Sequence, residues 1–218
     1  LPTDPEVDMN AEQIIKYWKY PFEEFTVQTD DGYLLTLYRI KKNCVDHSSC
    51  PSPPIILAHG LGASAEHWLM NPPASNPAFI FADAGFDVWL INFRGAKNTE
   101  KHTRFKRDSS EYWNFSWDQM SEFDLPAAID EILRVNGASR VYYVGHSQGT
   151  TVLFGKLSRD PSFSSKIARF FALAPITTAR KMRGPMTALA PITTARKRSN
   201  EILGGQEYVP PTQYVADL

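Results

Sequence analysis

The stretch VYYVGHSQGTTVLFGKL, residues 141–157, passes from a strand pattern to a helix pattern at a single serine. A strand that turns directly into a helix forces the residue at the junction into a strained, exposed backbone conformation. Glycine is then needed two positions before and two positions after it, because larger side chains would collide there. Gly145 and Gly149 stand at those positions around Ser147. The pattern predicts a nucleophile elbow that presents the Ser147 hydroxyl clear of a sheet; the alternative is a serine that only caps the helix.

Strand patterns alternate with helix patterns through most of the chain. Residues 23–40 contain two β-rich runs joined by Asp-Asp-Gly, which is typical of a hairpin. After this hairpin, short apolar runs typical of buried strands alternate with amphipathic segments. The expected strands are 53–60, 86–95, 140–147 and 167–175, and the expected helices are 76–85, 116–137 and 148–160. This order predicts an α/β fold with a largely parallel sheet and helices on both faces.

The longest expected helix carries its own start and stop signals. Ser116 to Gln119 resembles a capping box, and Gly137 is a typical stop. Pro126 lies between them and cannot donate a backbone hydrogen bond, so it should either kink the helix or mark a late start.

Length and composition are those of one domain, or of one domain with an appendage. The chain has 218 residues, 43% of them hydrophobic, which can bury a substantial core. The formal net charge of −1 gives no overall attraction to nucleic acid or to an anionic membrane. No apolar run approaches the roughly 20 residues that span a bilayer, so we expect no transmembrane segment. The sequence opens without a signal-peptide pattern and without Met, and its beginning therefore reads as processed or clipped.

Two features indicate candidate modifications. Cys44 and Cys50 enclose the turn-rich segment CVDHSSC. A short disulfide loop would fit a secreted or lysosomal protein, whereas two free thiols would fit a cytosolic one, and the spacing leaves both open. Adding His47 would give only three metal ligands, fewer than a structural zinc site has, so we expect no metal. An Asn-Phe-Ser acceptor triplet makes Asn114 a candidate glycosylation site.

A serine that transfers acyl groups needs two backbone N–H groups to stabilise the oxyanion. Gln148, directly after the serine, would supply one of them. The other should come from the loop HGLG (59–62), in which Leu61 would present its N–H. The two glycines of this loop leave the backbone free of side chains on either side of Leu61. His59 and His146 flank the two motifs. We interpret both as packing and hydrogen-bonding residues and not as the catalytic base.

These motifs and their surroundings resemble the acid lipase family of α/β-hydrolases, the group of gastric lipase and lysosomal acid lipase. The resemblance is carried by LAHGLGASAEHW (57–68), SWDQMSEFDLP (116–126) and VYYVGHSQGTT (141–151), together with the opening segment from Asp4. It implies the α/β-hydrolase fold, hydrolysis of triacylglycerols or sterol esters at a lipid–water interface, secretion or a lysosomal location, and no cofactor. By position, Ser147 matches the family's nucleophile, and Leu61 and Gln148 match its oxyanion donors.

The remainder of the family's catalytic triad is absent from these residues. In an α/β-hydrolase the triad runs Ser, then Asp or Glu, then His, but no histidine follows His146. Asp160 ends the helix after the elbow, which is the wrong place for the triad acid. The later acids, Glu201, Glu207 and Asp217, lie within residues 181–218. We therefore expect residues 1–180 to be an incomplete hydrolase core. The sequence reads as the N-terminal two-thirds of a lipase, truncated before the last strands and most of the lid, and as inactive by itself.

Residues 181–218 would begin the lid or cap region and contain a repeat. ALAPITTARK occurs at 172–181 and again at 188–197, which is a local duplication and not a solenoid. Only the first copy follows a strand-like lead, so only that copy is expected to enter the sheet. Two functions stay open: a lipase with a serine nucleophile, or a non-catalytic truncated homologue that binds lipid or a partner. The sequence does not indicate an oligomeric state.

Overall fold

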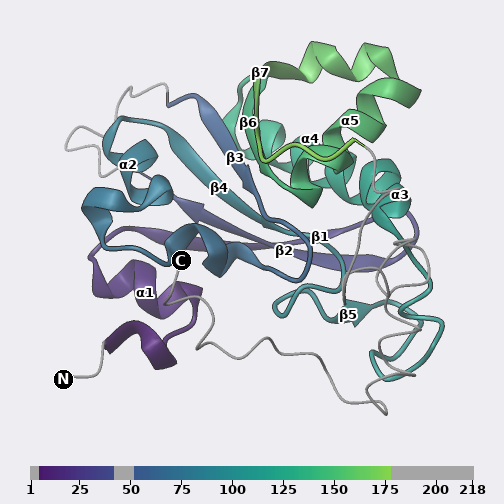
Figure 1. Cartoon of the computed structure of the whole chain (residues 1–218), viewed down its shortest axis with the longest axis horizontal. Helices are drawn as coiled ribbons and strands as arrows, with labels where there is room; N and C mark the ends of the chain where they lie inside the picture. The colour runs from purple at the N-terminus through teal and green to yellow at the C-terminus, as the bar shows by residue number, and fades with distance from the viewer. Residues whose placement is uncertain (1–4, 42–51, 178–218) are drawn as a thin grey trace.

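The computed structural model describes residues 5–41 and 52–177, in which helices cover both faces of a twisted sheet (Figure 1). The strands are β1 (Phe22–Gln28), β2 (Tyr33–Ile40), β3 (Pro54–Ala58), β4 (Asp87–Asn92), β5 (Lys101–His102), β6 (Val141–His146) and β7 (Ile167–Leu173). Their order is β1-β2-β4-β3-β6-β7, and the short β5 pairs with β2. The four strands β4, β3, β6 and β7 run parallel, whereas β2 is antiparallel to its neighbours. The predicted α/β architecture is confirmed, with an antiparallel hairpin at one margin.

Burial follows the position of each strand in the sheet. Every residue of β3 and β4 is buried, as expected for central strands covered on both faces. β7 is the edge strand at one end of the described sheet, and its Phe171 is 50% exposed. The first copy of the repeat contributes Ala172 and Leu173 to β7, as its strand-like lead predicts. The second copy, with residues 181–218 as a whole, lies outside the described residues.

The described helices are of three types: α, 3-10 and π. The α-helices are α1 (Ala11–Tyr17), α2 (Pro77–Asp83), α3 (Trp117–Gln119), α4 (Leu125–Asn136) and α5 (Gln148–Arg159). Short 3-10 helices are η1 (Pro5–Asp8), η2 (Ala65–Leu69), η3 (Pro73–Ser75) and η5 (Pro161–Lys166), and η4 (Met120–Asp124) is a π-helix. The sequence patterns did not predict α1, although Asn10 and Gln13 form a complete capping box at its start.

The helical segment around Pro126 begins at the capping box and contains a π-helical turn just before the proline. The capping box at Ser116 and Gln119 is present and opens α3. The π-helix η4 then separates α3 from α4, and the Leu125 N–H donates to the Met120 carbonyl, five residues back. Pro126 falls in the first turn of α4, directly after this π-helical turn. At the other end, Gly137 adopts a left-handed conformation with φ of 81° and stops the helix.

The two faces of the sheet have separate hydrophobic cores. Alternate residues of β4 point to opposite faces, as strand geometry requires. Trp89 and Ile91 pack with the apolar faces of α4 and α5, whereas Val88 and Leu90 pack with α1, α2 and η2. Helices therefore hold the sheet rigid from both sides, and its C-terminal edge provides a fixed platform for the loops that follow β3, β4 and β6.

Candidate functional site

Ser147 lies at the sharp turn between β6 and α5. Its backbone has φ of 51° and ψ of −116°, a left-handed conformation that is strained for a residue with a side chain. The Ser147 N–H donates to the Leu173 carbonyl of β7 at 2.9 Å, and the Ser147 carbonyl accepts from the Thr150 hydroxyl at 2.6 Å. The Ser147 side chain does not cap α5. The alternative of a serine that serves as a helix cap is therefore wrong.

The two flanking glycines are required by close backbone contacts. A Cβ atom placed on Gly145 would lie 2.9 Å from the Gly149 carbonyl carbon and oxygen. A Cβ atom on Gly149 would lie 2.6 Å from the Ala58 carbonyl oxygen and 2.9 Å from that of His59. The start of α5 thus rests directly on the ends of β6 and β3. This contact holds the residue between the two glycines at the surface of the sheet.

The HGLG loop, which follows β3, also packs beside Ser147. A Cβ atom on Gly60 would lie 3.1 Å from Ser147 Cβ, so this backbone packs against the elbow. Leu61, next in the chain, is 44% exposed. Gln148 is buried and is the first residue of α5, where backbone N–H groups have no acceptor within the helix. The loop that carries Leu61 and the helix start that carries Gln148 therefore both adjoin Ser147.

The His59 ring is fully engaged inside the protein. Its Nε2 accepts a hydrogen bond from the Phe93 N–H at 3.2 Å, and its Nδ1 lies 2.8 Å from the Gly60 carbonyl oxygen. Burial lowers the pKa of His59 to about 4, so the ring is neutral at physiological pH. The structure agrees with the interpretation of His59 as a packing and hydrogen-bonding residue.

The His146 ring lies beside Gly60, because a Cβ atom on Gly60 would lie 3.1 Å from His146 Nδ1. Its ring stacks on the His67 ring of η2 with centroids 4.7 Å apart and planes at 21°. Burial and the neighbouring His146 lower the pKa of His67. His146 Nδ1 is buried and makes no hydrogen bond with the described residues. His146 therefore packs as expected, without the expected hydrogen bond at Nδ1.

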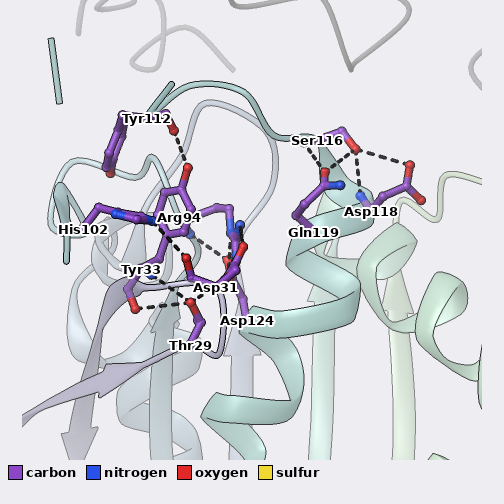
Figure 2. Close-up of polar contacts among 10 residues, drawn as sticks. All are labelled: Thr29, Asp31, Tyr33, Arg94, His102, Tyr112, Ser116, Asp118, Gln119 and Asp124. Carbon is purple, nitrogen blue, oxygen red and sulfur yellow. Dashed lines mark hydrogen bonds and ion pairs between the residues drawn. The ribbon is translucent and has the colours of Figure 1, made fainter. Parts of the chain in front are cut away.

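A second polar cluster surrounds Arg94, which follows β4, and Figure 2 shows its contacts. The buried guanidinium donates from Nε to Asp124 of η4 at 2.8 Å, and from Nη1 and Nη2 to Asp31 at 2.6 and 2.8 Å. The Arg94 backbone N–H also donates to Asp124, at 2.9 Å. The Arg94 Cζ atom lies over the Tyr33 ring, 4.0 Å from the ring centroid. The cluster ties the turn of the β1–β2 hairpin, the loop after β4 and the π-helix to one another.

One guanidinium pairs with two carboxylates in this cluster, so the cluster as a whole has a formal charge of −1 when both carboxylates are ionised. Burial raises the pKa of Asp124 to about 6 even though Arg94 opposes the shift. Asp31 is nearer to solvent, and hydrogen bonds from Arg94 and Thr29 outweigh its partial burial and lower its pKa. The partners of Arg94 could not be read from the sequence.

The remaining candidate residues are placed as follows. Asn114 is exposed in the turn before α3, as a glycan acceptor must be. Cys44 and Cys50, the candidate disulfide, lie outside the described residues. Within residues 5–41 and 52–177, no three His, Cys, Asp or Glu side chains are grouped so that they could hold a metal ion. In the same two ranges no helix is both long and apolar enough to cross a membrane.

Comparison with known proteins identifies relatives over most of the chain. Residues 11–72 match a family model described as a partial alpha/beta-hydrolase lipase region, and residues 53–207 match the alpha/beta hydrolase fold. Human lipase member K is 48% identical over 185 residues, which cover 84% of this chain and 46% of that protein. Human lysosomal acid lipase/cholesteryl ester hydrolase is 41% identical over 213 residues, which cover 97% of this chain and 53% of that protein. Mouse gastric triacylglycerol lipase is 48% identical over 187 residues, covering 84% and 47%.

Solved structures support the fold. An esterase from Pyrococcus furiosus superposes with a TM-score of 0.56 at 19% identity, over 88% of this chain and 66% of the esterase chain. An epoxide hydrolase from Vigna radiata superposes with a TM-score of 0.51 at 17% identity, over 80% and 47%. The chain spans about half the length of the curated relatives that it matches, less than the two-thirds expected from the sequence. The chain belongs to the α/β-hydrolase family, and its N-terminal part matches the lipase region of that family.

Proposed function

We propose that the protein is a lipase-type carboxylic ester hydrolase in which Ser147 is the nucleophile and the backbone N–H groups of Leu61 and Gln148 bind the oxyanion. The observation that carries the proposal is the strained backbone of Ser147, with φ of 51° between two glycines that permit no side chain. Strain of this kind persists where the surrounding structure enforces it, and it is concentrated at active sites. The Gly60 loop packs against the same serine, so both oxyanion donors adjoin the nucleophile.

In the proposed reaction the Ser147 hydroxyl oxygen attacks the ester carbonyl carbon, and its proton passes to a general base. The tetrahedral oxyanion then collapses, the ester C–O bond breaks, and the alcohol leaves with that proton. Water hydrolyses the resulting acyl-enzyme, which releases the fatty acid and restores the serine. No step of this sequence needs a cofactor.

Apolar side chains near Ser147 favour a lipid ester as the substrate. Leu61, Leu173 and Ile176 are 44%, 45% and 37% exposed. Leu173 contacts Ser147 through its carbonyl, and the Ile176 N–H donates to the Thr150 hydroxyl at 3.1 Å. Exposed apolar groups beside a reactive serine suit the acyl chains of a triacylglycerol or sterol ester at a lipid–water interface. The relatives' names mention gastric and lysosomal lipases, so we also propose that this protein is secreted or lysosomal.

The general base and its acid partner are proposed to lie outside residues 1–218. No histidine follows Ser147 in the sequence, and the described histidines near it are His59, whose ring nitrogens are both engaged, and the stacked pair of His67 and His146. Loss of a triad histidine lowers kcat by about 10⁶, or roughly 8 kcal/mol of transition-state stabilisation. The 218 residues alone should therefore show almost no turnover.

The test is hydrolysis of a fluorogenic fatty acyl ester by the 218-residue chain and by the longest natural form of the protein. Each form is assayed as it stands, as Ser147→Ala, and as Ser158→Ala, which removes an exposed serine from the same helix. We expect activity only in the longer form, lost in Ser147→Ala and kept in Ser158→Ala. Rapid turnover by the 218-residue chain would show that an internal histidine acts as the base. Activity that survives Ser147→Ala would refute the assignment of the nucleophile.

A further inference from the structure

The His59 ring holds one particular peptide group beside the elbow. The Phe93 backbone N–H can only donate, so His59 Nε2, which lies 3.2 Å from it, must be unprotonated. In a neutral imidazole the proton is then on Nδ1, which donates to the Gly60 carbonyl oxygen at 2.8 Å. A backbone group at the end of β4 thus fixes the tautomer of a side chain at the end of β3.

The contact of His59 with Gly60 also determines where the Leu61 N–H points. The Gly60 carbonyl and the Leu61 N–H belong to one planar peptide unit, and in a trans peptide they point in opposite directions. The Ala63 N–H donates to the same carbonyl oxygen at 3.3 Å, in a turn in which Gly62 has φ of 72°. The carbonyl is therefore held from two sides, and the opposite edge of the peptide carries the Leu61 N–H.

The Gly60 peptide that His59 holds lies directly against the elbow, so a change in its direction would be felt beside Ser147. A Cβ atom on Gly60 would lie 3.1 Å from both Ser147 Cβ and His146 Nδ1, so the backbone is packed against the elbow. The groups that act electrostatically on His59 are Glu66 and His67 of η2, and burial keeps the ring neutral above about pH 4, the value to which its pKa is lowered. The ring therefore keeps its donor and its acceptor wherever the protein works above that pH.

We propose that His59 is a positioning residue for the oxyanion hole: its hydrogen bond to the Gly60 carbonyl directs the Leu61 N–H toward the oxyanion. The inference rests on the proposed function, because it assigns a role within the same site. His59 touches neither substrate nor nucleophile and acts only through the Gly60–Leu61 peptide. Small errors in the direction of an oxyanion donor lower the rate because the donor acts on charge that develops in the transition state.

Two substitutions separate this role from general support of the fold. His59→Asn keeps an amide N–H near the position of Nδ1 and so retains the donor to Gly60, but it loses the acceptor for the Phe93 N–H. His59→Gln can place its amide oxygen near the position of Nε2 and so retains the acceptor for Phe93, but it loses the donor to Gly60. Each variant keeps one hydrogen bond of the wild-type ring, so they are matched controls for each other.

The assay is steady-state hydrolysis of a fluorogenic fatty acyl ester by the longest natural form, with the folded fraction measured by circular dichroism. We expect His59→Gln to lower kcat by about 100-fold, the lower end of the loss seen when an oxyanion donor is removed, with KM changed less than about twofold. His59→Asn should keep kcat within about tenfold of wild type. Equal losses of kcat in the two variants, or a wild-type kcat in His59→Gln, would overturn the proposal.

A measurement independent of activity tests the geometry. Nitrogen-15 NMR of the His59 ring in the 218-residue chain should show the Nδ1–H tautomer, and the Nε2–H tautomer would overturn the proposal whatever the kinetics. If the natural protein has the Nδ1–H tautomer but does not hydrolyse esters, then the proposed function fails and the positioning role falls with it. The two failures are therefore distinguishable.

Discussion

Replacing Gly149 with alanine tests why the elbow needs glycine. In a helix, alanine is favoured over glycine by about 1 kcal/mol, so an unobstructed Gly→Ala change in α5 would stabilise the protein. At Gly149 the new methyl carbon would lie 2.6 Å from the Ala58 carbonyl oxygen and 2.9 Å from that of His59. Both atoms belong to the backbone at the end of a central strand, so the helix or the strand must move. Overpacking of this kind costs about 1–3 kcal/mol, and rigid backbone obstacles favour the upper end.

We therefore expect Gly149→Ala to lower the free energy of unfolding by about 2 kcal/mol, after its gain in helix propensity is subtracted. Gly155→Ala is the matched control in the same helix, because its methyl carbon would meet the Trp117 side chain at 2.6 Å and not a strand backbone. A side chain can rotate away, so this variant should stay within about 1 kcal/mol of wild type. Urea unfolding followed by circular dichroism measures both. A Gly149→Ala protein as stable as wild type would refute the steric account of the elbow.

Two further predictions concern Asp124 and Asn114. Burial raises the pKa of Asp124 from 3.8 to about 6, so between about pH 4 and 6 the folded protein binds a proton that the unfolded chain does not. The stabilisation from this proton is present below pH 4 and is lost as the pH rises through 6. We expect urea titrations across this range to show that Asp124→Asn removes a decline of about 3 kcal/mol in the unfolding free energy; an unchanged decline would contradict the assignment. Because Asn114 is exposed, we also expect protein from its natural source to lose mass on glycosidase treatment, and Asn114→Gln to abolish that loss. An unaltered mass would show that the acceptor triplet is unused.

Local sequence determined the features that depend on short-range sterics. The spacing of Gly145, Ser147 and Gly149 encodes the elbow because collisions between near neighbours exclude other residues there. The capping box at Ser116 and the stop at Gly137 were predicted equally well from the sequence. Ser116 satisfies hydrogen bonds at the start of its own helix, and Gly137 ends those of its own helix. The effect of Pro126 was predicted only as a kink or a late start, and nothing in the sequence indicated the π-helical turn that precedes it in the structure.

The tertiary structure decided what depends on residues far apart in the chain. Arg94 meets Asp31 and Asp124 across 63 and 30 residues, and β4 inserts between β2 and β3. The His59 tautomer likewise depends on an N–H 34 residues away. No periodicity or short motif encodes such pairings, because they form only when whole elements pack and fix the direction of each loop. The sequence therefore determined the serine and the bends around it, and packing determined which groups hold the surrounding backbone in place.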